Sequence, residues 1–192
     1  MTALTLNLDS IVHMTHEQFH ELCRENRDVR LELTARGELI VMPPTGWESG
    51  NRNIKLAARL QNWTETDGTG MAFDSSTGFI LPNGAIRSPD AAWVAMAKLT
   101  ALNSDPEGFL PLSPDFVIEL RSASDRLKPL QDKMQEYIDN GVRLGWLLNP
   151  KDRAVEIYRM GKGIEILRSP TEVSGEDVLS GFVLNLEEIF GA

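Results

Sequence analysis

The sequence predicts an α/β fold: a single domain in which helices flank a mixed β-sheet, with an N-terminal helix and hairpin. Short runs rich in Val, Ile and aromatic residues, bounded by Pro, Gly or Ser, are typical of buried strands. Along the chain they alternate with longer segments in which apolar residues recur at helical spacing. The length of 192 residues suits one domain, which we expect to occupy residues 1–192 with its core at about 15–190.

Four segments are predicted to be helical because apolar residues line one face of each. The first begins with a capping box, in which Thr15 and Gln18 each accept a hydrogen bond from the other's backbone N–H. The last ends at Gly141, and its Pro129 is tolerated because it lies in the first turn. In chain order, the predicted helices are residues 15–26, 47–66, 97–102 and 124–140, followed by a tail with short helix at 177–190.

Alternating or wholly apolar runs predict the strands. Residues 29–34 and 38–42 alternate polar and apolar side chains on either side of the turn at 35–37, which indicates a hairpin. A second hairpin at 78–87 leads into the run that contains Asp90. The remaining predicted strands are residues 71–74, 86–94, 114–122, 143–149, 154–159 and 164–168.

The composition limits the classes of function. No apolar run approaches the ~18–20 residues of a membrane span, and the N-terminus lacks a secretory signal, so a cytoplasmic location is expected. The single cysteine, Cys23, cannot form an internal disulfide, which agrees with a reducing compartment. The net charge of -9 counts against tight, non-specific binding of nucleic acid, although metal ions can neutralise clustered acids.

Two of the apolar runs contain an acidic residue that could take part in a site. Asp90 lies in the run 86–94, and Glu119 lies near the end of the run 114–122. An ionised carboxylate inside a sheet is costly unless it is paired or binds a metal. The two acids therefore suggest that a positively charged group is bound between them.

An ordered set of motifs surrounds these acids. Pro89-Asp90 begins one strand, the triplet Glu119-Leu120-Arg121 closes the next, and Lys133 to Tyr137 follows on a helix, with Gly141-Val142 and Trp146 to Pro150 beyond it. The set resembles the PD-(D/E)XK nuclease superfamily and, more closely, its Uma-type family of restriction-endonuclease-like proteins, over about 15–190. The resemblance implies a restriction-endonuclease-like fold and cleavage of DNA.

Phosphodiester hydrolysis of this kind would use Mg²⁺, with Mn²⁺ as an alternative, because hard cations held by carboxylates activate water and neutralise phosphate. Asp90 and Glu119 are the expected metal ligands, and the carbonyl of Leu120 is the expected third. DNA is the expected partner. A homodimer is expected because two sites cut two strands most simply.

The superfamily places a lysine two residues after the acid, where this chain has Arg121. Arginine stays protonated, so it can hold phosphate but is a poor proton acceptor. Because side chains alternate along a strand, Arg121 is expected on the same side as Glu119. Lys133 lies at the rim of the buried stripe of its helix and is the alternative source of the ammonium group.

The helix at 47–66 leaves one polar strip outside its buried arc. Arg52 and Lys55 on that strip are candidates for contacts with DNA phosphates, and Glu48 resembles the superfamily's auxiliary acid, which could bind the metal through water. The alternative is a solvated face on which Glu48 and Arg52 pair at i,i+4.

Structural roles are also open for the central acids. Asp90 could cap the turn after Pro89, and Glu119 could be the buried ion-pair partner of Arg121 or Lys133. The sequence thus predicts a Mg²⁺-dependent endonuclease. The alternative is a nuclease-fold protein that binds DNA or a protein without cutting, and a hydrolase of another phosphate ester comes third.

Overall fold

A computed structural model describes residues 3–8, 11–102 and 108–191. The helices are α1 (His16–Glu25), α2 (Trp47–Asp67), α3 (Met96–Thr100), α4 (Leu127–Asp139) and α5 (Glu187–Phe190), with a 3-10 helix η1 (Pro150–Asp152). The strands are β1 (Leu4–Leu6), β2 (Arg30–Leu33), β3 (Leu39–Met42), β4 (Gly70–Asp74), β5 (Phe79–Ile80), β6 (Ile86–Arg87), β7 (Ala91–Ala95), β8 (Phe116–Leu120), β9 (Leu144–Asn149), β10 (Ala154–Arg159), β11 (Glu165–Arg168), β12 (Glu172–Ser174) and β13 (Val183–Asn185).

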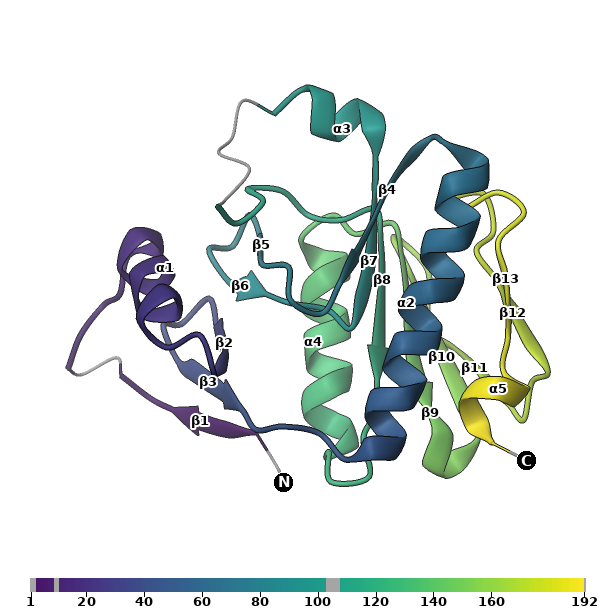
Figure 1. Ribbon diagram of the computed structural model, residues 1–192, viewed down its shortest axis with the longest axis horizontal. Coiled ribbons are helices and arrows are strands. Elements are labelled where there is room, and N and C mark those ends of the chain that lie inside the picture. The colour runs from purple at the N-terminus through teal and green to yellow at the C-terminus, as the bar shows by residue number, and fades with distance from the viewer. Residues whose placement is uncertain (1–2, 9–10, 103–107, 192) are drawn as a thin grey trace.

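The largest sheet has six strands in the order β11-β10-β9-β8-β7-β4. Its β8 and β9 are parallel and its other neighbours are antiparallel, so the sheet is mixed, as the sequence predicts. A second, five-stranded sheet has the order β1-β3-β2-β6-β5, and β12 pairs with β13. The α/β fold class is confirmed, with several sheets flanked by helices rather than one (Figure 1).

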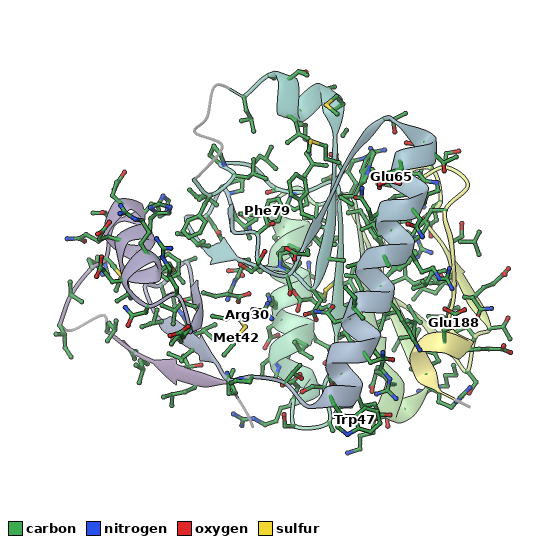
Figure 2. The ribbon with its side chains drawn as sticks, viewed as in Figure 1. Arg30, Met42, Trp47, Glu65, Phe79 and Glu188 are labelled. Carbon is green, nitrogen blue, oxygen red and sulfur yellow. The ribbon has the colours of Figure 1, made fainter. Side chains whose placement is uncertain are left out.

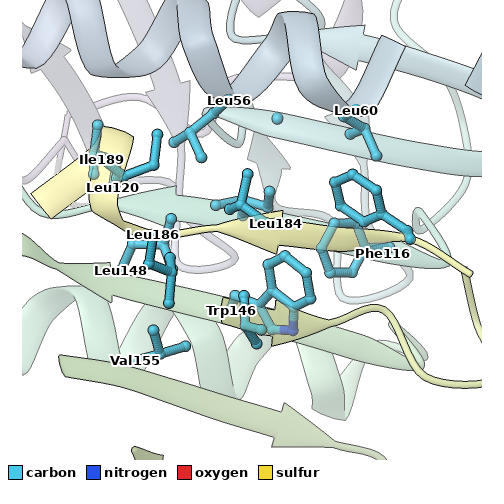
Figure 3. Close-up of a cluster of buried hydrophobic side chains, with 14 of the residues drawn as sticks. Leu56, Leu60, Phe116, Leu120, Trp146, Leu148, Val155, Leu184, Leu186 and Ile189 are labelled. Atoms are coloured by element: carbon cyan, nitrogen blue, oxygen red, sulfur yellow. The ribbon is translucent and has the colours of Figure 1, made fainter. Parts of the chain in front are cut away.

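Helices α2 and α4 lie on opposite faces of the six-stranded sheet (Figure 1). Figure 3 shows Leu56 and Leu60 of α2 packed with Phe116 and Leu120 of β8. The intervening Val117 belongs to the cluster under α4. Because strand side chains alternate, Glu119 also faces α4, on the face opposite to Leu120.

Local signals account for most helix boundaries. The capping box of Thr15 and Gln18 is present at the start of α1. Helix α2 ends at Gly68, whose φ of 69° is the left-handed conformation that glycine adopts without strain. Within the described residues no helix is both long and apolar enough to cross a membrane.

Several elements differ from the prediction. The strand predicted at 86–94 is divided into β6 and β7, which belong to different sheets, and Asp90 lies between them, directly before β7. Helix α4 begins at Leu127 rather than at 124 or 125, because the Asp125 carboxylate instead accepts a hydrogen bond from the Ser122 N–H at 2.9 Å and closes a turn. The C-terminal tail, expected to be short helix, first forms the β12–β13 pair and only then α5.

Candidate active site

Asp90 directly precedes β7, and Glu119 lies in the neighbouring strand β8 of the six-stranded sheet. Ala91 of β7 pairs with Ile118 of β8 in antiparallel register, and continuing this register by one residue brings Asp90 beside Glu119. The Asp90 Oδ2 atom accepts a hydrogen bond from the Leu120 N–H at 2.8 Å. Asp90 therefore contacts the backbone of β8 at the residue that follows Glu119.

Glu119 contacts two side chains of α4. The Lys133 Nζ atom lies 2.7 Å from Glu119 Oε1, and the Tyr137 hydroxyl donates to the same oxygen at 3.0 Å. Lys133 and Tyr137 are one helical turn apart, so one face of α4 presents both groups to β8. Lys133 therefore places its ammonium group directly beside Glu119.

Glu32 of β2 joins this cluster although the sequence analysis did not include it. Its Oε1 atom lies 2.8 Å from Lys133 Nζ and accepts from the Ser88 N–H at 3.0 Å, and its Oε2 lies 3.1 Å from Arg87 Nη1. Glu32 is only 2% exposed. Arg87 also pairs with Glu136 at 2.6 Å, which extends the network back to α4.

The only sequence signal for Glu32 is an acid in a strand that alternates with Leu31 and Leu33. Both leucines belong to the core cluster under α1, so Glu32 faces the opposite side of its sheet. Such alternation ordinarily indicates a solvent-facing acid. Here Lys133 of α4 and Arg87 of β6 bind the carboxylate, and these contacts cannot be deduced from the local pattern.

Burial and neighbouring charges shift the pKa values of the cluster. Burial, together with the charges of Asp90 and Glu32, raises the pKa of Glu119 to about 7 against the opposing effect of Lys133. Burial also raises the pKa of Asp90. For Glu32, burial is outweighed by the combined attraction of Lys133 and Arg87, so its pKa is lowered.

The ammonium group of Lys133 and the phenol of Tyr137 keep their protons. Burial alone would lower the pKa of Lys133, but the charges of Glu119 and Glu32 outweigh it, so that pKa is raised. Burial and the Glu119 charge raise the pKa of Tyr137. At neutral pH Lys133 is therefore an ammonium ion and Tyr137 a neutral donor, and neither group is a proton acceptor.

The cluster lies in a cleft of ≈ 830 Å³. One wall is the face of the N-terminal sheet that carries Arg30, Glu32 and Met42, and Figure 2 shows Arg30 and Met42 between this sheet and α4. The other walls are the first half of α4 and the start of α2, which carries Trp47. The cleft gives solutes access to the carboxylates.

Two further groups reach Asp90. The Asn53 Nδ2 atom of α2 donates to Asp90 Oδ1 at 3.4 Å, a long contact. Leu120 directs its N–H toward Asp90, and the carbonyl of a strand residue points to the same edge as its N–H. The Leu120 carbonyl, an expected metal ligand, therefore faces the edge of β8 on which Asp90 lies.

Arg121 does not face the site as expected. Its side chain donates to the Asp125 carbonyl at 3.2 Å and to Asn149 Oδ1 at 3.3 Å, and it forms an ion pair with Asp152 at 3.1 Å. Strand β8 ends at Leu120, so the alternation that would have placed Arg121 beside Glu119 stops one residue too early. The prediction of Arg121 as a site cation is therefore wrong.

The polar strip of α2 agrees with the alternative prediction, in which Glu48 and Arg52 pair with each other on the helix surface. Arg52 pairs with Glu48 at 2.7 Å, and Lys55 donates to the carbonyl of Glu188 in α5 at 3.3 Å. Neither cation lines the cleft, which corrects their expected role in binding DNA phosphates there. Glu48 lies at the cleft, but its carboxylate is bound to Arg52 and its side chain is 61% exposed.

The oxygen atoms in the site suit a hard divalent cation. From the described residues, Asp90 Oδ1 accepts the long contact from Asn53 and no other hydrogen bond, and Glu119 Oε2 accepts none. No group of three or more His, Cys, Asp or Glu side chains in the described chain is arranged to hold a metal, so a cation would also need neutral oxygen ligands. The carbonyl of Leu120 is one such ligand.

The cluster also carries the charge that a cation would neutralise. Its carboxylates belong to Glu32, Asp90, Glu119 and Glu136, and its cations belong to Arg87 and Lys133. Arg30 in the wall of the cleft also acts on Asp90, so four negative and three positive groups leave an excess of one negative charge when every carboxylate is ionised. A bound cation would neutralise this excess.

Comparisons with known proteins agree with this architecture. The chain matches the crystal structure of "a putative nuclease belonging to DUF820" from Anabaena variabilis, with a TM-score of 0.77, 17% sequence identity, and coverage of 92% of this chain and 97% of that one. At this identity the match shows the fold, which is that of a nuclease-like α/β protein. The chain belongs to the Uma2 family, described as "putative restriction endonuclease", whose model matches residues 16–187. No curated protein matches the chain.

Proposed function

We propose that this protein is a Mg²⁺-dependent endonuclease that hydrolyses phosphodiester bonds in DNA. The observation that carries the proposal is the position of Asp90 opposite Glu119 at an accessible cleft, with the Lys133 ammonium 2.7 Å from Glu119. Membership of the Uma2 family supports the same class of reaction. Mn²⁺ is an alternative cation because it also prefers oxygen ligands.

Asp90, Glu119 and the Leu120 carbonyl would hold the metal. Bound there, Mg²⁺ would neutralise phosphate charge and lower the pKa of a coordinated water. For Glu119 to bind a cation it must be ionised, which its raised pKa makes incomplete at neutral pH. Asp90 is held in place by the Leu120 N–H, so the carboxylate does not have to reorient.

Lys133 would act as a cation toward the substrate. Its raised pKa keeps the ammonium protonated, so it can donate hydrogen bonds to a phosphate oxygen or to the departing oxygen, and it is a poor general base. Glu32 holds the ammonium at 2.8 Å, and Arg87 in turn holds Glu32. These contacts fix the position of the charge before substrate binds, which is the form of electrostatic stabilisation that enzymes use most effectively.

A catalytically inactive DNA- or protein-binding module is the second candidate. The observation that favours it is the occupation of Glu119 Oε1 by both Lys133 and Tyr137, which satisfies this oxygen without a metal. The net charge of -9 also weakens attraction to DNA.

Cleavage of plasmid and single-stranded DNA by the purified protein separates the two candidates. We expect cleavage with Mg²⁺ or Mn²⁺ that is lost in chelator and in Asp90→Asn and Glu119→Gln. Glu156→Gln is the matched control, because Glu156 is also a buried carboxylate of the six-stranded sheet but lies outside the cleft. If cleavage survives both site substitutions, the assignment is wrong; if the wild type never cleaves, the binding module is favoured.

A homodimer is the proposed assembly, because two sites are the simplest means of cutting both strands of a duplex. Light scattering coupled to size exclusion should then give twice the chain mass of 21.4 kDa. A monomer that only nicks plasmid would contradict the dimer and leave the proposed chemistry intact.

A further inference from the structure

One buried oxygen in the cleft has no hydrogen-bond partner. Among the described residues, three buried side-chain polar atoms are unpaired: Asn53 Oδ1, Trp93 Nε1 and Trp146 Nε1. The two indole nitrogens lie in the apolar core between the sheet and α2. Only Asn53 lines the cleft, and only its unpaired atom is an acceptor. Buried acceptors are ordinarily paired, so we expect this oxygen to have a partner when the cleft is occupied.

The orientation of the Asn53 amide follows from its neighbour. The Nδ2 atom donates to Asp90 Oδ1 at 3.4 Å. The reverse orientation would place the amide oxygen against a carboxylate oxygen, where two acceptors repel. The amide oxygen is therefore the atom that Asp90 leaves without a partner.

Within the described residues, three oxygen atoms around Asp90 accept one long hydrogen bond or none: Asp90 Oδ1, Asn53 Oδ1 and Glu119 Oε2. The nearby donors already have partners: Lys133 binds Glu119 and Glu32, and Tyr137 binds Glu119. Arg30, whose charge also acts on Asp90, donates to the Ser75 carbonyl at 2.8 Å. A phosphate or carboxylate would add more acceptors, whereas a divalent cation would satisfy all of these oxygens at once.

We propose that the Asn53 side-chain oxygen is a ligand of the divalent cation held by Asp90 and Glu119. The inference rests on the proposed function and adds to it a residue of α2. Asn53 replaces Glu48 as the residue of α2 that contacts the metal, because the Glu48 carboxylate is bound to Arg52. A neutral amide oxygen also accounts for the absence, in the described chain, of a third acidic or histidine ligand.

Mn²⁺ titration followed by electron paramagnetic resonance, without DNA, tests the proposal independently of turnover. We expect Asn53→Ala to weaken Mn²⁺ binding roughly 10- to 100-fold, as loss of a supporting metal contact does elsewhere. Asn53→Asp, which restores an oxygen and adds a charge, should bind at least as tightly as the wild type. The proposal is overturned if Asn53→Ala binds like the wild type, or if Asn53→Asp binds as weakly as Asn53→Ala.

Asn51 provides matched controls two residues earlier on the same helix. It is exposed and does not line the cleft, so Asn51→Ala and Asn51→Asp should leave Mn²⁺ affinity close to that of the wild type. If Asn51→Asp tightens binding as much as Asn53→Asp, the gain is one of general charge and the proposed contact is overturned.

A measurement on the wild type avoids any loss of folding in a variant. The ¹³C and ¹⁵N resonances of the Asn53 side-chain amide should shift during a Mg²⁺ titration, with the same dissociation constant as the protein as a whole. An unshifted amide in a protein that binds Mg²⁺ and cleaves DNA overturns this inference alone. A wild type that binds neither Mg²⁺ nor Mn²⁺ overturns the proposed function, and this inference with it.

Discussion

Lys133 holds two buried carboxylates at once, and it is the cation closest to Glu119. Lys133→Met should abolish cleavage and lower the free energy of unfolding by about 3 kcal/mol, because it leaves buried carboxylates without their counter-charge. Arg121→Gln should keep most of the activity and cost less than about 1 kcal/mol, because its partner Asp152 is half exposed.

Nicking assays and urea unfolding on the two variants check this assignment. The reverse result, with activity lost in Arg121→Gln and kept in Lys133→Met, would show that the structure places the wrong cation at the site.

The raised pKa of Glu119 makes both metal binding and stability depend on pH. Between the ordinary glutamate value of 4.5 and about 7, folded Glu119 keeps a proton that the unfolded chain has released. Raising the pH through this interval therefore lowers the free energy of unfolding. The same change raises the Mg²⁺ affinity, by roughly tenfold for each pH unit below the pKa.

Urea unfolding and Mg²⁺ calorimetry across this interval measure the two effects. Asp90 has a raised pKa and contributes in the same direction, so the comparison with Glu119→Gln isolates Glu119. The stability of this variant should vary less with pH than that of the wild type. An equal pH dependence in the two proteins would assign the effect to other groups.

At the level of elements, Arg87 connects the N-terminal sheet to α4. The guanidinium of this β6 residue is bound by Glu32 of β2 and Glu136 of α4, and all three side chains are largely buried. Arg87→Met should lower the free energy of unfolding by about 3–5 kcal/mol, because two buried carboxylates lose their partner.

Arg36→Met is the matched control, since the Arg36 side chain is 80% exposed and its pairing with Glu38 contributes little. Chemical denaturation of both variants gives the comparison. A similarly small loss of unfolding free energy in both variants would mean that water reaches Arg87. The ion pairs of Arg87 would then not hold the N-terminal sheet and α4 together.

For the molecule as a whole, the charge of -9 predicts how DNA binding depends on metal. Phosphates and the ionised site repel each other, so fluorescence anisotropy should detect little binding in chelator and stronger binding with Ca²⁺. The double variant Asp90→Asn/Glu119→Gln should bind DNA more tightly than the wild type in chelator, because two negative charges are gone. Tight metal-free binding by the wild type would contradict this prediction.

The fold and half of the site could be predicted because their signals are local. Apolar runs predict the neighbouring strands β7 and β8, although the run 86–94 is interrupted before β7, where Asp90 lies. Glu32 could not be found in this way, since it lies 101 residues from Lys133 in the sequence. The side chain of Arg121 was predicted to face the wrong side because β8 ends at Leu120. An error of one residue in the end of a strand is enough to change the predicted direction of a side chain.

The order of Asp90, Glu119 and Lys133 along the chain decides which incomplete polypeptides can contain the proposed site. A ribosome delivers both acids of the pair, Asp90 and Glu119, before it delivers the lysine on α4. A polypeptide that ends before α4 therefore lacks the ammonium group that the proposed chemistry requires.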